Sequence, residues 1–488
     1  MSRKSVLRAA AWGAVLSACA LGSWAHAARS SAPMHGRISS VSPFNAALIG
    51  AGVRAPLAGP VINAPLMTPL ARTSMLPLSA KPLAASAPAL PAASRLLASL
   101  TPQPAPIEAS TAYADAPSVA ETETMKWQRF FDAAAPQGSE NTIPEPNIGQ
   151  LRALTDARGI FEHATYTEPN KTHGYASEDV GRALVASLMF NQQRANDPTA
   201  AALARTYMDY LQQAQIHNGE FRHRLSADGV WSQDLVTDDA YGRVLWGLGY
   251  AAAHPLDADM GARAAKMFDR ALSRAERQKW PRALAYSMLG LDHYLERFPD
   301  SPRVKKLLIR SADKLLRFYK DNASEDWQWF EEVATYDNAK MPQALFLAYK
   351  HTGKKKYLAV AQKTLDFLIR TNFPDDGMLR VIGNKGWYRR GGKPALYDQQ
   401  PIDAAGMVEA LAEAYRCTGL SGYSDKMKTA FAWFLGRNIL GLQIYDPTTG
   451  GSRDGLNKGK RNDNQGAESS IEFMISQLTM LQILAPGR

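Results

Sequence analysis

Residues 338–369 read NAKMPQALFLAYKHTGKKKYLAVAQKTLDFLI and hold two apolar helical patterns separated by a short break. In 338–350 and again in 354–369, apolar residues recur every three or four positions, the spacing that gathers them on one face of an α-helix. The break covers only residues 351–353 (HTG), and a connection this short places consecutive helices side by side and antiparallel. This stretch therefore predicts a helical hairpin.

The same pattern recurs along the chain as an irregular repeat. Further pairs of helices begin near residues 177, 237, 280 and 401, and a last apolar helix covers about 467–484. Five pairs and one further helix make eleven helices, and a twelfth at 122–133 or 148–157 would complete six hairpins. We therefore predict an all-α fold.

Six helical hairpins can close into a ring or stack into an open superhelix. Clusters of polar and aromatic residues favour the ring, because they differ between hairpins and most lie where the first helix of a pair begins. A closed ring of antiparallel hairpins would gather these helix starts around one cavity. We therefore predict an (α/α)6 toroid, with inner and outer layers of helices, over residues 122–488.

Residues 1–27 have the composition of an export signal, with basic side chains at the start, an apolar run over 9–24 and a small-x-small cleavage site over 25–27. Residues 16–19 (LSAC) also resemble a lipobox, in which Cys19 would carry a lipid anchor. The apolar run continues past this cysteine, so ordinary cleavage is favoured. We expect an exported protein of the periplasm or cell envelope, whose only membrane contact would be that possible anchor.

Residues 28–121 are rich in Ala, Pro, Ser and Leu and carry few charged or aromatic side chains. Such a composition buries too little apolar surface to offset the entropy lost on ordering. The prolines recur too often for a helix to persist. We predict a flexible spacer between the signal and the toroid, or alternatively a pro-region.

The composition excludes several classes of protein. The chain contains 45% hydrophobic residues and only two cysteines, so the fold depends on its core and has no disulfide framework. No zinc-type Cys/His spacing, phosphate-binding loop or dinucleotide fingerprint occurs, and the nine histidines include no pair on one helix face. We expect no cofactor, no metal site and no nucleic-acid partner.

Six short polar and aromatic clusters carry the functional signal. In sequence letters they are GYASED at 174–179, DDAYGR at 238–243, WQWFEE at 327–332 with YDN at 336–338, YDQQPID at 397–403, DG at 454–455, and NQGAES at 464–469. These strings resemble a bacterial and archaeal six-hairpin, (α/α)6 glycosidase-like family often found fused to or beside glycosyltransferases. Its hallmark strings look like G-Y-x-x-D-D-N-A-R-A-L, W-x-W-F-E, Y-D-Q-Q-P and N-x-N-Q-G-A-E-S-T.

The resemblance covers roughly residues 159–484 and implies a toroid that handles carbohydrate. The chain departs from the family at Glu178-Asp179-Val180-Gly181, where D-D-N-A is usual, and at Ser470, where Thr is usual. These departures leave a role for Glu178 open.

The same clusters fit glycoside cleavage on chemical grounds. This reaction needs two carboxyl groups across one bond, one protonated and one ionised, with amides and aromatics to hold the sugar. As catalytic carboxyls we predict Glu331, Asp239, Asp403 and Glu468. As substrate-binding residues we predict Tyr175, Arg243, Trp329, Tyr336, Asn338, Trp387, Asp398, Gln399, Gln400, Asp454, Asn464 and Gln465.

Glu331 and Asp239 receive separate roles. Three aromatic residues closely precede Glu331, and an apolar wall favours the protonated form of a carboxyl group, so we assign Glu331 as the general acid. Asp239 lies beside Arg243, which favours an ionised carboxylate that could activate water.

Each of these residues also has a structural interpretation. Asp238, Asp337 and Asn338 could cap helices, and Glu468 could interact with a helix dipole. Trp327 and Trp329 could belong to the core.

Two basic loops flank the clusters, one with Lys385, Arg389, Arg390 and Lys393 and one with Arg453, Lys458, Lys460 and Arg461. They are either solvated loops or a site for an anionic glycan, because clustered cations raise the local concentration of anions.

We therefore predict a glycoside hydrolase, inverting by analogy with other (α/α)6 enzymes, that acts on a polysaccharide or oligosaccharide. Two rivals stay open: a polysaccharide lyase acting on a uronate glycan, for which Tyr336 and Asn338 would serve, and a non-catalytic subunit of a polysaccharide export system. Sugar epimerases share the toroid, but they usually have a catalytic histidine, and no cluster here contains one.

Overall fold

The computed structural model describes residues 143–484, except 195–196 and 375. The predicted signal peptide, the spacer and the possible helix at 122–133 lie outside the described residues. Within the described part, no helix is both long and apolar enough to cross a membrane.

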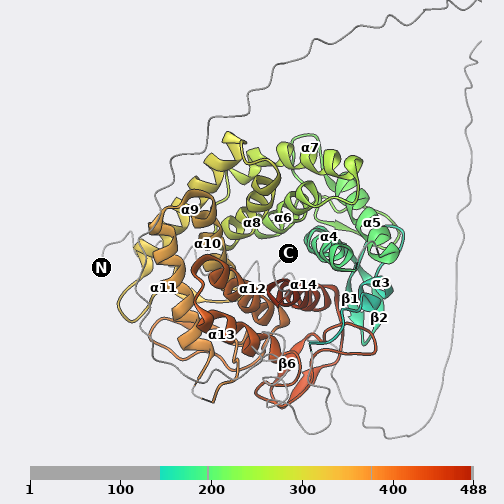
Figure 1. The fold of residues 1–488 in the computed structure, drawn as a ribbon. Coiled ribbons are helices and arrows are strands. Elements are labelled where there is room, and N and C mark those ends of the chain that lie inside the picture. Colours follow the sequence, from blue (N-terminus) through green and yellow to red (C-terminus); the bar gives the residue numbers. More distant parts are fainter. Residues whose placement is uncertain (1–142, 195–196, 375, 485–488) are drawn as a thin grey trace, which may run out of the picture. The chain divides into compact units, whose positions relative to one another are not determined.

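Six helices form a closed inner ring (Figure 1). Each packs against the next in sequence, and the last packs against the first, which closes the ring. They are α4 (Ser177–Gln193), α6 (Asp238–Ala253), α8 (Pro281–Arg297), α10 (Lys340–Thr352), α12 (Pro401–Thr418) and α14 (Ala467–Leu484). The closed ring confirms the predicted (α/α)6 toroid and excludes the open superhelix.

An outer layer covers the ring. Each of its longer helices follows an inner helix and packs back against it: α5 (Pro198–Ala214), α7 (Ala258–Ala275), α9 (Pro302–Asn322), α11 (Lys355–Asn372) and α13 (Ser421–Ala432). The short α3 (Gly149–Ala153) lies in the outer layer beside α14, within the segment 148–157 that the sequence proposed (Figure 1). α13 ends five residues before the expected position 437, where turns replace the helix.

Local sequence explains where helices begin. Thr237 caps α6 by accepting a hydrogen bond from the backbone N–H of Ala240, and Asp197 caps α5 in the same way. Pro281 and Pro401 open α8 and α12, where the first helical residue has no need of an N–H group.

Glycines set the distance between three neighbouring inner helices. A Cβ on Gly247 would come within 2.4 Å of the carbonyl oxygen of Gly181, and one on Gly249 within 2.1 Å of that of Gly290. The backbones of α4, α6 and α8 therefore touch, and no larger residue fits at these positions.

Short strands, which the sequence did not predict, lie in the connections that precede inner helices. β1 (Phe161–Thr165), β2 (Glu168–Ala176) and β3 (Arg224–Leu225) form an antiparallel sheet in that order. Two small pairs join β4 (Val333–Ala334) to β5 (Tyr388–Arg389) and β6 (Gly455–Asn457) to β7 (Lys460–Asn462). These strands fix the loops at the end of the ring where the inner helices start.

A layer of buried charges crosses the middle of the inner ring. Lys340 pairs with Glu409 at 2.7 Å, and Arg182 pairs with Glu472 at 2.8 Å, with all four side chains almost completely buried. The Lys340 ammonium also lies over the ring of Trp246, 4.9 Å from its centre. This layer separates the end where the helices begin from a cavity at the other end.

Candidate functional site

All six inner helices run in the same direction, because each is joined to the next through one returning outer helix. Their N-termini therefore meet at one end of the ring, which we call the entry end. Asp239, Asp403 and Glu468 lie in the first turns of α6, α12 and α14, and Glu331 lies in the connection before α10. The structure thus brings the four predicted carboxyl groups to one end of the toroid.

Arg282, in the first turn of α8, lies at the centre of this end. Its guanidinium group donates to Glu331 Oε2 at 2.8 Å, to Asn338 Oδ1 at 3.0 Å and to the backbone oxygen of Tyr336 at 2.6 Å. It also lies over the ring of Tyr336, 4.8 Å from its centre. One buried cation thus fixes three predicted site residues.

Asp239 joins the same network through Tyr336. The Tyr336 hydroxyl donates to Asp239 Oδ2 at 2.9 Å, and Arg243 lies 3.3 Å from the same oxygen. The second oxygen, Oδ1, has no hydrogen-bond partner among the described residues. This arrangement holds one carboxylate oxygen and leaves the other buried without a protein partner among the described residues.

Asp403 and Asp337 form a close acidic pair. The backbone N–H of Asp337 donates to Asp403 Oδ1 at 2.6 Å, and the Tyr286 hydroxyl donates to Asp337 Oδ2. Burial raises the pKa of Asp337 to about 7, and burial together with the nearby Asp337 charge holds the pKa of Asp403 well above its usual range.

The backbone around this pair is unusual. Asp337 has a φ of 43°, in the left-handed region that non-glycine residues seldom adopt. Gly406 on α12 makes room for it, because a Cβ there would lie 2.5 Å from Asp337 Oδ1. Strained residues of this kind concentrate at functional sites.

Glu468 favours the ionised form, unlike Asp403 and Asp337. Arg182 donates to its Oε2 at 3.1 Å, and the Arg182 side chain also contacts Asp179. Burial opposes ionisation of Glu468, but the charges of Arg182 and Arg243 outweigh it and hold the pKa of Glu468 below its usual range. Its side chain is 43% exposed, so this group is only partly buried.

Sequence reasoning missed a second cationic group at this end. His223 Nε2 lies 3.2 Å from Glu178 Oε1, and Arg224 binds Glu162. Burial opposes ionisation of Glu178, but the hydrogen bond to His223 lowers the pKa of this carboxyl to about 2. The same bond raises the pKa of His223. The pairing of β2 with β3 brings these residues together, and that register had no signal in the sequence.

Four residues predicted to contact substrate are buried in this structure. Tyr175, Trp329, Gln399 and Gln465 are at most 1% exposed and have no surface to offer a sugar. The Tyr175 hydroxyl donates to Asp156, and Trp329 stacks on Phe367 in the core. Gln399 accepts from Trp433 Nε1, while Gln465 donates to Asp446.

The environment of Glu331 also differs from the expected apolar wall. Trp327 Nε1 donates to the backbone oxygen of Glu331, while its ring packs against Phe367, so it belongs to the core. The carboxyl group instead contacts Arg282. The apolar surroundings on which the assignment of Glu331 as proton donor rested are therefore replaced by a cation.

Other predicted residues shape the surrounding loops. Gln400 donates to Asp398 Oδ1 at 3.0 Å, and burial raises the pKa of Asp398. Asp454 accepts from the Gly466 N–H at 2.9 Å, and Asn464 accepts from the Tyr166 N–H at 2.9 Å, so both hold the start of α14. Trp387 is only partly buried and keeps surface for a ligand.

The entry end therefore contains carboxyl groups of both kinds. Asp403 and Asp337 favour the protonated form, and Glu468 favours the ionised form. Arg282 lies within electrostatic range of Asp403, Asp239 and Glu331 together. A protonated acid and an ionised base around one site are what glycoside cleavage requires.

A six-hairpin toroid with such a set of carboxyl groups and arginines fits a carbohydrate-active protein. The sequence matches the family described as "Beta-L-arabinofuranosidase, GH127 catalytic domain" over residues 179–429, and the chain belongs to this family of glycoside hydrolases. No curated protein matches the chain in sequence.

Solved structures with a similar fold act on sugars. A D-mannose isomerase aligns with a TM-score of 0.55 and 14% identity, over 68% of this chain and 93% of that chain. A sugar epimerase from a ruminal bacterium aligns with a TM-score of 0.55 and 12% identity, over 70% and 96%. A cellobiose 2-epimerase from Spirochaeta thermophila aligns with a TM-score of 0.54 and 12% identity, over 69% of this chain and 94% of that chain. At these identities the likeness shows the fold alone.

Proposed function

We propose that this protein is an exported glycoside hydrolase whose proton donor is Asp403 and whose water-activating carboxylate is Asp239. The observation that carries the proposal is the contrast between two carboxyl groups near Arg282. Asp403 is buried against a second acid, whereas Asp239 is held by Arg243 and Tyr336.

The reaction follows from this contrast. Asp403 gives its proton to the glycosidic oxygen as the bond from that oxygen to the anomeric carbon breaks. Asp239 takes a proton from the water that attacks the same carbon. If attack comes from the face opposite the leaving group, the anomeric configuration inverts. Glu331 then positions Arg282 rather than donating a proton.

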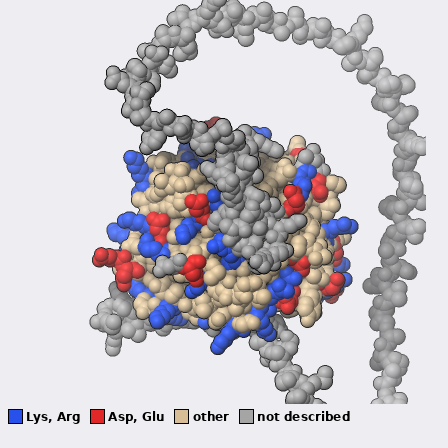
Figure 2. Space-filling view, turned by 60° about the horizontal axis from the view of Figure 1, so that its bottom comes forward, with Lys and Arg blue, Asp and Glu red and all other residues tan. Residues whose placement is uncertain are grey.

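The family description makes a β-L-arabinofuranoside the first substrate to test. An anionic glycan has weaker support, because acidic partners contact several basic side chains of the two loops. Arg390 pairs with Glu332, and Arg453 and Arg461 both pair with Asp463. On the face seen in Figure 2, acidic and basic side chains of the described residues are interspersed.

Location in the periplasm or cell envelope rests on the export signal over 1–27, and a lipid anchor would require Cys19. Association with glycosyltransferases rests on the six-hairpin resemblance of the sequence.

A second candidate is a sugar isomerase or epimerase. The histidine that the sequence clusters lacked is present at the entry end, where His223 contacts Glu178. An imidazole beside a carboxylate can move a proton to and from a sugar carbon.

Assays on the full chain separate these reactions. We expect release of 4-nitrophenol from 4-nitrophenyl β-L-arabinofuranoside, or of reducing ends from neutral polysaccharides. Proton NMR of the first product anomer tests inversion. An ultraviolet-absorbing unsaturated product from a uronate polysaccharide would indicate a lyase. An epimerised sugar without bond cleavage would refute the hydrolase.

A further inference from the structure

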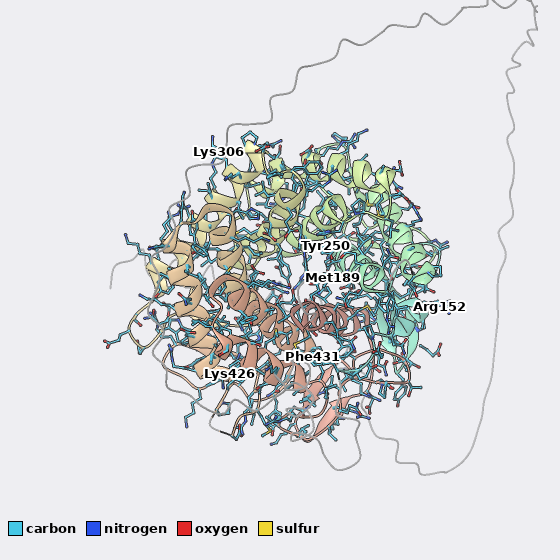
Figure 3. All side chains as sticks on the ribbon, in the orientation of Figure 1. Arg152, Met189, Tyr250, Lys306, Lys426 and Phe431 are labelled. Atoms are coloured by element: carbon cyan, nitrogen blue, oxygen red, sulfur yellow. The ribbon has the colours of Figure 1, made fainter. Side chains whose placement is uncertain are left out.

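The opposite end of the inner ring contains a cavity of about 560 Å³. All six inner helices contribute to its wall, mostly through their C-terminal halves. Met189 and Tyr250, two of the lining residues, lie toward the middle of the ring (Figure 3). This cavity lies beyond the layer of buried charges and has no part in the proposed hydrolysis.

Three potential metal ligands meet in the wall of this cavity. His254 ends α6, and His293 and Glu296 lie three residues apart in the last turns of α8. Glu296 Oε2 lies 3.3 Å from His254 Nε2 and 3.1 Å from His293 Nδ1. The three ligand atoms all lie within 4.8 Å of one another.

The surroundings hold these side chains in place. The Tyr250 ring packs against both imidazoles, with ring centres 4.7 Å apart in each case. Glu296 lies within hydrogen-bond distance of both imidazoles, which holds the carboxylate between them. The ligands are therefore oriented before any ion binds.

The charges around the cluster also favour a cation. Lys350 contacts Glu296 Oε1 at 2.7 Å and Asp292 at 3.0 Å, so two carboxylates face one ammonium group. With neutral imidazoles, one negative charge remains. The cluster also lies at the C-terminal ends of α6 and α8, where helix dipoles favour positive charge.

We propose that His254, His293 and Glu296 bind a divalent transition metal ion, with one coordination position open to the cavity. Two imidazoles and one carboxylate form a ligand set typical of Zn²⁺ sites that keep a position for water or a small ligand. The site would join the ends of α6 and α8. No metal site was expected because the sequence has no pair of histidines on one helix face, whereas these two histidines come from α6 and α8.

Zinc binding to the full chain, produced without a histidine tag and freed of metal with a chelator, tests the proposal. We expect one Zn²⁺ per chain by equilibrium dialysis and elemental analysis near pH 7.5, together with a higher melting temperature. Cobalt(II) should give the visible absorption bands of a low-coordinate site. His293→Ala and Glu296→Gln should each weaken binding at least tenfold.

His217→Ala is the matched control, because this histidine lies in the connection after α5, away from the cavity, and should bind zinc like the unaltered protein. Circular dichroism verifies that each variant is folded. Glu296→Gln serves if His293→Ala does not fold, since it preserves size. Stoichiometry far below one, or equal affinity in the folded variants and the unaltered protein, would overturn the proposal.

Discussion

The two ends of the inner ring are built from the same six helices but hold different sets of side chains. At the entry end, carboxyl groups from four connections or first turns surround Arg282, Arg243 and Arg182. At the cavity end, histidine, lysine and arginine side chains such as His254, Lys350 and Arg416 alternate with carboxylates such as Glu296 and Glu413.

Helix direction explains much of this contrast. Parallel inner helices present their positive dipole ends and free N–H groups at one end of the ring and their negative ends at the other. Acidic groups therefore gain stability at the entry end and cations at the cavity end. The direction of the inner helices therefore favours an acid–base site at one end and a cation site at the other, whatever the loops contain.

The strongest test of the contrast is to neutralise one acid at the entry end. Asp403→Asn removes the proposed proton donor and should lower kcat by about 10²- to 10⁴-fold, the usual contribution of general acid catalysis. Steady-state kinetics on the best glycoside substrate would measure it. Gln482→Ala, which alters the cavity wall at the other end, should retain normal kcat. If Asp403→Asn is fully active and Glu331→Gln is inactive, the donor is Glu331.

The second test compares two lysines on α10. Lys340→Met would leave Glu409 buried and unpaired, which should lower the free energy of unfolding by about 3–5 kcal/mol. Lys350→Met removes a lysine that is 37% exposed, and its buried partner Asp292 keeps His351 at 2.7 Å, so the cost should be smaller, about 1 kcal/mol. Chemical denaturation measures both. Combining Lys340→Met with Glu409→Leu should recover much of the loss. Equal effects of Lys340→Met and Lys350→Met would contradict the buried layer of charges.

The smallest expected effect is a shift in pH dependence. Because Asp403 must carry its proton to act, activity should fall as the pH rises through its raised pKa. Asp337→Asn removes the neighbouring negative charge, so this alkaline limb of kcat/KM should move to lower pH by roughly one unit. The limb should stay in place in Gln482→Ala. An unmoved limb in Asp337→Asn would show that another group donates the proton.

The sequence predicted the helices because their apolar spacing is long and regular, as in the hairpin at 338–369. It also placed Asp239, Asp403 and Glu468 at one end, since ring topology alone brings the starts of inner helices together. The orientation of single side chains could not be predicted. Trp329 lies in the connection between α9 and β4, and its neighbours, such as Phe367, come from elsewhere in the chain.

Arg282 illustrates what sequence reasoning lacks. It stands alone after a proline in an ordinary apolar helix, without any polar cluster around it. Its partners Glu331 and Asn338 are 49 and 56 residues away in sequence. Arg282 reaches these partners only because α8 packs against α10 in the ring.

Closure of the ring has a consequence for how the chain acquires its structure. Arg182 on α4 binds Glu472 on α14 across 290 residues, and Gln477 bonds to the backbone of Pro144 across 333. Contacts this distant along the chain form late in folding, because a long loop must first be closed. During synthesis, the apolar face of α4 thus stays uncovered until the last helix has left the ribosome. A chain that loses α14 is therefore expected to aggregate rather than to form five stable hairpins.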